Sequence, residues 1–267
     1  AALVGPNGCG KSTLLRMAAG IVPPSAGQVL LKGRPLSGFS RRELGQLISY
    51  LPQSRPVPGI SVQSMVMHGR FPYLGYPRRY RKEDWQMVQK AMEWAGVTHL
   101  AGRDMSRLSG GERQKVYFAM CLAQDSQVLF LDEPTTYLDL SHQFEIMELT
   151  RQLEQAGKTV IMVLHDLGLA LSYADQLAVM QFGRLVFAGS PQEVLESGCL
   201  EQVFRVRIQK GGLQKSGGYL FFPAGPKEEK DGEGDHDTGD HVECGKEPDC
   251  GGTLPHFPAG RLPGGPF

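Results

Sequence analysis

Short apolar runs alternate with helix-forming stretches along most of the chain. Residues 3–4, 128–131 and 160–164 are continuously apolar, and the two later runs have the length of buried strands. A helix is expected over residues 12–19, where Gly20 ends it. From residue 109 to 188 the pattern predicts helix, strand, helix, strand, helix and then a hairpin. This alternation favours an α/β fold with a mainly parallel sheet.

The segment from about residue 54 to 107 has a different pattern. It opens with Pro and Gly, contains a basic cluster, and then carries apolar residues at helical spacing: Met87, Val88, Ala91, Met92 and Ala95. Gly96 follows directly and is a typical helix end. We therefore expect a helical subdomain inserted into the α/β core.

The composition changes abruptly after Pro223. Residues 224–267 contain 10 Gly, 6 Pro, 4 basic and 10 acidic residues, although the whole chain has 28 basic and 28 acidic residues. The segment has few large apolar side chains, so their burial cannot offset the entropy that the chain would lose on ordering. This acidic segment is therefore expected to be disordered. Its His and Cys residues could bind zinc or iron, or could simply be solvated. Residues 1–223 are then the folded domain, whose modest positive charge suits phosphate ligands without implying nucleic acid.

No apolar run approaches the roughly 18–20 residues that a helix needs to span a bilayer. The 5 Cys residues are scattered without the spacing of a disulfide framework. The lack of such a framework fits a reducing cytosol.

A glycine-rich turn separates the first apolar run from the first predicted helix. Its residues fit the phosphate-loop pattern G-x-x-x-x-G-K-[ST]: Gly5, Pro6, Asn7, Gly8, Cys9, Gly10, Lys11 and Ser12. Backbone N–H groups of such a turn surround phosphate oxygens, and the following helix points its positive end at them. Lys11 would bridge the β- and γ-phosphates, Ser12 would ligate Mg²⁺, and Thr13 would complete the nucleotide-binding segment. Cys9, between two glycines, is expected to be sterically open and reactive.

Two carboxylates follow the apolar run 128–131. Parallel α/β sheets bind ligands at the carboxyl ends of their strands, so Asp132 and Glu133 would lie beside the phosphates. Asp132 would hold Mg²⁺ directly or through water, and Glu133 could act as general base on the attacking water. Alone, the pair could be a solvated acidic turn. Together with Lys11 it favours nucleotide hydrolysis.

Residues 108–114 form a second candidate anion site. Ser109 and Glu112 have the spacing of a capping box, which alone predicts only a well-capped helix. Gly110 and Gly111, however, expose backbone N–H groups at that helix N-terminus. Two phosphate sites in one chain suggest a nucleotide sandwiched between two copies.

These motifs together resemble those of ABC ATPases. Residues 108–114 look like the signature motif of that family, and Gln53 matches its Q-loop glutamine. Asp139 ends a stretch that is similar to the D-loop of the family. His165 follows an apolar run, which is where the family has its switch histidine. The resemblance covers about residues 1–223. It implies a P-loop NTPase core with ATP and Mg²⁺ as ligands.

The resemblance also implies how two subunits cooperate. In a head-to-tail homodimer, Ser109 and Gly111 of one subunit would contact the γ-phosphate bound at Lys11 of the other. Gly110 and Asp139 belong to the same nucleotide-binding set. The dimer would close when ATP binds and reopen after hydrolysis, and this motion would move permease subunits docked on the helical subdomain.

Within one subunit, the resemblance implies roles for two further polar residues. Gln53 would sense both Mg²⁺ and the attacking water, as a metal ligand and a catalytic residue. His165 would contact the γ-phosphate and help to arrange Glu133.

Residues 66–73 and 132–143 resemble the subfamily that drives iron-siderophore, haem and cobalamin importers. This implies uptake of an iron-siderophore or a related metal chelate, with cobalamin and haem left open. The implied partners are integral permease subunits and, indirectly, an extracytoplasmic substrate-binding protein, with no nucleic acid. The implied location is peripheral, at the cytoplasmic face of the membrane.

Two other functions compete with transport. One is a soluble ABC ATPase that serves assembly or repair, such as one acting on iron–sulfur scaffolds. The other is a nucleotide-binding regulator that has lost hydrolysis, against which Glu133 and His165 argue.

ABC ATPases place an adenine-stacking aromatic residue on a strand ahead of the phosphate loop. This chain has five residues, Ala1 to Gly5, before Pro6. The resemblance therefore leads us to expect an N-terminally truncated fragment without that strand.

Overall fold

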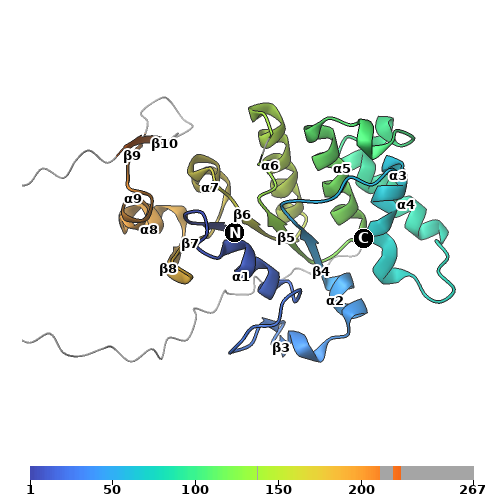
Figure 1. Cartoon of the computed structure of the whole chain (residues 1–267), viewed down its shortest axis with the longest axis horizontal. Coiled ribbons are helices and arrows are strands. Elements are labelled where there is room, and N and C mark those ends of the chain that lie inside the picture. Colours follow the sequence, from blue (N-terminus) through green and yellow to red (C-terminus); the bar gives the residue numbers. More distant parts are fainter. Residues whose placement is uncertain (137, 211–218, 224–267) are drawn as a thin grey trace, which may run out of the picture. The chain divides into compact units, whose positions relative to one another are not determined.

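A computed structural model describes residues 1–136, 138–210 and 219–223, which belong to one compact unit (Figure 1). The described part contains a sheet in the spatial order β4–β5–β6–β1–β7–β8. Its strands are β1 (Ala2–Val4), β4 (Ile48–Leu51), β5 (Val128–Asp132), β6 (Thr159–Val163), β7 (Leu177–Gln181) and β8 (Arg184–Gly189). The first five strands of this order pair in parallel, and only β8 is antiparallel to its neighbour.

Helices connect these strands. The α-helices are α1 (Lys11–Ala18), α2 (Arg41–Leu47), α3 (Val62–Met67), α4 (Lys82–Trp94), α5 (Gly110–Ala123), α6 (Leu140–Gln155), α7 (Leu167–Tyr173), α8 (Pro191–Glu196) and α9 (Cys199–Phe204). Short 3₁₀ helices are η1 (Leu36–Gly38), η2 (His68–Tyr73), η3 (Thr98–Leu100) and η4 (Met105–Arg107). Two small antiparallel pairs are β2 (Leu30–Leu31) with β3 (Arg34–Pro35), and β9 (Val206–Lys210) with β10 (Tyr219–Pro223).

The sheet is covered on both faces, as a parallel sheet must be. Successive side chains of a strand point to opposite faces. Leu129 and Leu131 of β5 accordingly enter the large core formed with α5, α6 and α7. Phe130, between them, joins a smaller core with Leu15 of α1. The apolar run 128–131 is continuous because both of its faces are buried.

The residues between β4 and α5 are largely helical. α3, η2 and α4 pack against α5, and Figure 1 draws them together beyond the β4 edge of the sheet. An almost fully buried ion pair joins η2 to α4, with Arg70 Nε 2.9 Å from Asp84 Oδ1. Arg70 Nη1 also donates to the carbonyl of Ala123 at the end of α5, at 2.8 Å. The helices therefore share one packed core rather than standing apart.

The predicted fold class is confirmed, and most predicted elements are found. The order predicted over residues 109–188 is α5, β5, α6, β6, α7 and the hairpin β7–β8. The helix predicted to end at Gly96 is α4, with Gly96 at φ 66° directly after its C-cap. Just before Gly33, only Leu30 and Leu31 form a strand, which pairs with β3. The expected disorder and metal binding of residues 224–267 lie outside the described residues.

Gly69 allows η2 to approach α5 closely. A Cβ atom at Gly69 would lie 2.2 Å from the carbonyl oxygen of Met120 and 3.0 Å from the backbone N of Gln124. Helix backbone atoms cannot move aside as a flexible side chain can. We predict that Gly69→Ala lowers the free energy of unfolding by about 3 kcal/mol, as overpacked cores do. Urea unfolding followed by circular dichroism would measure this change.

Gly75→Ala is the matched control. Nothing lies within 4 Å of a Cβ at Gly75, and its φ is not positive. This variant should change the free energy of unfolding by less than about 1 kcal/mol. Equal urea midpoints for the two variants would contradict the close-approach argument.

Candidate active site

The phosphate loop joins the end of β1 to the start of α1. Gly10 is the N-cap of α1 at φ 98°, in the region that favours glycine. Lys11 begins the helix and is 5% exposed. Its Nζ donates to the carbonyls of Gly5, at 2.7 Å, and Pro6, at 3.0 Å. The lysine therefore spans the loop from inside, and its charge lies where phosphate oxygens would bind.

The expectation of an open thiol at Cys9 is wrong. Cys9 is 5% exposed and packs with Leu3 and Leu15 in the smaller core. Its Sγ lies 2.8 Å from the position that a Cβ on Gly5 would occupy. Its carbonyl accepts a hydrogen bond from the backbone N of Gly183, at 3.1 Å. Cys9 thus anchors the underside of the loop to the β7–β8 turn.

Asp132, the last residue of β5, is 1% exposed and has two hydrogen-bond donors. Ser12 Oγ donates to its Oδ1 at 2.8 Å, and Tyr50 Oη donates to its Oδ2 at 2.9 Å. The Tyr50 hydroxyl in turn accepts from Arg16 Nε at 3.2 Å. Burial raises the pKa of Tyr50 above its ordinary value, so the hydroxyl remains a donor. A continuous chain of polar contacts thus links α1, β4 and β5.

Glu133 directly follows β5 and receives contacts from three other side chains. Gln53 Nε2 and Thr136 Oγ1 both donate to its Oε2, the latter at 3.1 Å. His165 Nε2 is paired with Oε1, and the Glu133 side chain is only 8% exposed. Glu133 also has φ 53°, a strained conformation for a residue other than glycine. Such strain costs about 1 kcal/mol or more and is concentrated at functional sites.

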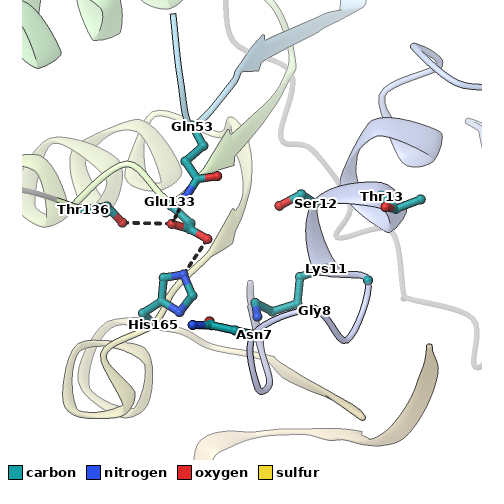
Figure 2. Close-up of a pocket in the computed structure, with 10 residues that line it drawn as sticks. Asn7, Gly8, Lys11, Ser12, Thr13, Gln53, Glu133, Thr136 and His165 are labelled. Atoms are coloured by element: carbon teal, nitrogen blue, oxygen red, sulfur yellow. Dashed lines mark hydrogen bonds and ion pairs between the residues drawn. The ribbon is translucent and has the colours of Figure 1, made fainter. Parts of the chain in front are cut away.

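Residues of the phosphate loop, the start of α1 and the segments after β4, β5 and β6 line one pocket of about 530 Å³. Figure 2 shows Glu133 with Gln53, Thr136 and His165 on one wall, and Lys11 with its neighbours in the phosphate loop on the other. The lining residues are Asn7, Gly8, Gly10, Lys11, Ser12, Thr13, Gln53, Glu133, Thr136 and His165. A cation-bearing loop and a hydrogen-bonded carboxylate thus face the same space.

Other sequence-predicted residues stand outside this lining. Gly5, Pro6 and Cys9 belong to the loop but not to the pocket wall, and Asp132 lies beneath it. The signature residues lie at the N-terminus of α5, where Ser109 and Glu112 form the expected capping box. Ser109 Oγ accepts a hydrogen bond from Glu112 N at 3.2 Å, and Glu112 Oε2 accepts one from Ser109 N at 2.8 Å. Ser109, Gly110, Gly111 and Asp139 do not line the pocket.

Sequence reasoning missed three residues that shape the site. Thr136 contacts Glu133, and its proximity in the chain was an available signal. Tyr50 and Arg16 support Asp132 from β4 and α1. Their distance along the chain from Asp132 left no local pattern to reveal them.

Comparisons with known proteins agree with this geometry. The profile of the ABC transporter family matches residues 1–136. The ferric enterobactin transport ATP-binding protein FepC of Escherichia coli (strain K12) is 42% identical over 226 residues, which is 84% of this chain and 83% of FepC. The chain belongs to the ABC transporter family. Because the ATP-binding proteins of this family are ATPases, it is an ATPase that binds ATP.

Other relatives agree with this ABC assignment. The hemin import ATP-binding protein HmuV of Streptomyces coelicolor is 43% identical over 223 residues, which is 83% of this chain and 79% of HmuV. A solved inward-facing ABC transporter assigned to the metal-chelate type has a TM-score of 0.72 and 28% identity, and covers 83% of this chain and 86% of that one. No helix among the described residues of this ABC ATPase has the length and apolar character that a membrane span requires.

The support of Asp132 by Tyr50 can be tested by removing one hydroxyl. Tyr50→Phe leaves Asp132 with a single side-chain donor in a buried position. We predict a loss of about 1–2 kcal/mol in the free energy of unfolding, because a buried carboxylate loses a hydrogen bond. We also expect ATP hydrolysis to fall severalfold as the carboxylate turns away from Ser12. Urea unfolding and phosphate release would measure the two effects.

Tyr173→Phe is the control, since Tyr173 is the last residue of α7 and its hydroxyl has no side-chain hydrogen bond within the described residues. Both quantities should stay near those of the parent. Hydrolysis by Tyr50→Phe at the parent rate would mean that Ser12 alone positions Asp132.

Proposed function

We propose that this chain couples ATP hydrolysis at the pocket to the import of an iron-siderophore or a related metal chelate. The observation that carries hydrolysis is Glu133, a carboxylate held by three side chains and facing the phosphate loop across one pocket. The cargo follows from the relatives, because FepC is named for ferric enterobactin transport.

The pocket supports a direct displacement at the γ-phosphate. Lys11 and the N-terminus of α1 would neutralise the β- and γ-phosphate oxygens. A water near Glu133 would attack phosphorus while Glu133 accepts its proton, and ADP would leave. Gln53 and His165 would hold the carboxylate so that it faces this water.

The residues at the base of the pocket fit Mg²⁺. Ser12 Oγ and Asp132 Oδ1 are oxygen donors that lie 2.8 Å apart. Neighbouring oxygens around an octahedral Mg²⁺ are about 3 Å apart, because each lies 2.0–2.1 Å from the ion. The Gln53 side-chain oxygen would be a third donor. Bound Mg²⁺ would neutralise charge on the phosphate oxygens as the leaving group departs.

A second subunit completes the site in this proposal. Ser109, Gly110 and Gly111 form the N-terminal turn of α5, and Ser109 and Gly110 are exposed. The Ser109 hydroxyl caps Glu112, so the N–H groups of Gly110 and Gly111 stay available for an anion. In a head-to-tail homodimer, Ser109 and these glycine N–H groups would contact the γ-phosphate that the other subunit binds, and Asp139 would lie beside that phosphate.

The proposed partners follow from an importer role. Two of these ATPase subunits would sit at the cytoplasmic face of the membrane, docked through the helical subdomain, about residues 54–107, on integral permease subunits. An extracytoplasmic substrate-binding protein would deliver the chelate. Haem is a second candidate cargo, because HmuV, a hemin import protein, is 43% identical and FepC is 42% identical. Uptake of labelled ferric siderophore and of haem by cells with and without this chain would separate the two.

Replacing the general base tests the hydrolysis step. We predict that Glu133→Gln binds ATP normally but hydrolyses it on the order of 10²–10⁴ times more slowly, because the amide cannot accept the proton. ATP should then hold the variant as a dimer. Phosphate release and sedimentation velocity with Mg-ATP would measure both effects.

Glu148→Gln makes the same chemical change at an exposed position of α6, and should leave the rate unchanged. Near-parent turnover by Glu133→Gln would overturn the assignment of Glu133 as the base.

Mixing two inactive variants tests the shared site. Lys11→Ala retains Ser109, and Ser109→Arg retains Lys11, so a mixed dimer contains one intact Lys11–Ser109 pair. We predict that the mixture recovers up to about a quarter of the parent ATPase activity, since half of randomly paired dimers have one working site of two.

The control is Lys11→Ala mixed with the Lys11→Ala/Ser109→Arg double variant, which offers no intact pair. Full ATPase activity of the Ser109→Arg homodimer by itself would refute the sandwich.

A further inference from the structure

The carboxylate of Asp139 is shared by three donors from the start of α6. Its Oδ1 accepts from His142 N at 3.0 Å, from Ser141 Oγ at 2.8 Å, and lies 2.7 Å from His142 Nδ1. These contacts, the backbone one first, hold the pKa of Asp139 at about 2, so the carboxylate is ionised at any physiological pH. An ionised carboxylate only accepts, so His142 Nδ1 carries a proton.

The other edge of the His142 ring lies directly on the signature segment. A Cβ at Gly111 would lie 2.8 Å from His142 Cδ2 and 3.0 Å from Nε2. Only a glycine can be so close to this ring, since real Cβ contacts are not that short. One imidazole therefore touches both Gly111 of α5 and Asp139 before α6.

The contact between His142 and Asp139 is not required to cap the helix. The backbone N of His142 already supplies the N-cap hydrogen bond of α6, and any residue other than proline at position 142 would supply it. An ion pair between Lys115 and Glu145 ties the same two helices together farther along. The side chain of His142 is thus available to bridge Asp139 and the first turn of α5.

We propose that His142 is a positioning residue that holds the signature glycine Gly111 and Asp139 in a fixed relation, so that both engage the opposing nucleotide together. This inference rests on the proposed nucleotide sandwich. His142 contacts neither phosphate nor water in this role. It restricts the backbone that does, by filling the space beside Gly111 while its Nδ1–H holds the Asp139 carboxylate.

Three variants separate the two contacts of the ring, and a fourth is the control. His142→Asn keeps a donor near the place of Nδ1 and removes the ring edge from Gly111. His142→Phe keeps an aromatic ring and removes the donor, and His142→Ala removes both. Glu148→Ala, at an exposed position of α6, is the control.

The measurement is ATP-driven dimerisation in a Glu133→Gln background, followed by sedimentation velocity. We expect His142→Ala to raise the dimer dissociation constant at least tenfold and to lower kcat similarly with Glu133 restored. ATP affinity of the monomer and the urea midpoint should not change, because Lys11 and the core are untouched. His142→Asn and His142→Phe should each recover part of the loss, and Glu148→Ala should match the parent.

The outcomes distinguish failure of the His142 role from failure of the proposed sandwich. Dimerisation of His142→Ala at the parent affinity overturns the role of His142, as does a loss accompanied by an equal fall in monomer ATP affinity or in the urea midpoint. Failure of the Glu133→Gln parent to dimerise with ATP, despite binding it, overturns the proposed sandwich and the His142 role with it.

Discussion

Parallel hydrogen bonding between β4, β5, β6 and β1 is the constraint on which the pocket depends. The register pairs Leu51 with Leu131 and both Asp132 and Leu3 with Val163, so the four strands end at one level. The segments that follow them therefore start from the same edge of the sheet. A slip of one residue in β5 would exchange its two buried faces and turn Asp132 away from Ser12.

On this edge, the proposed general base, Glu133, is held in place by its surroundings. Its contacts come from segments after β4, β5 and β6, and its backbone is held at φ 53°. A group fixed in this way needs little reorganisation when charge develops at the reacting atoms. The strain at Glu133 is sustained by the surrounding hydrogen bonds rather than by the local sequence.

The signature helix α5 is linked to the same edge through Gln114. Its Nε2 donates to the carbonyl of Pro134, next to Glu133, at 2.7 Å, and its Oε1 accepts from Arg55 Nη2 at 3.2 Å. Arg55 follows Gln53 by two residues, so α5 contacts the two segments that carry Gln53 and Glu133. The helices that pack on α5 are thus connected through Gln114 to the segments that carry Gln53 and Glu133.

The sequence by itself determined the features that depend on near neighbours along the chain. The phosphate loop over residues 5–12, the capping box that begins at Ser109, and the order of helices and strands after it are all readable, because helix caps, tight turns and apolar periodicity involve residues a few positions apart. Only the tertiary structure decided which distant side chains meet. It brought Tyr50 to Asp132 and Gln53 to Glu133, and it buried Cys9 under the loop although its neighbours suggested exposure. Such contacts depend on strand register and on packing between layers, which join residues that no local pattern relates.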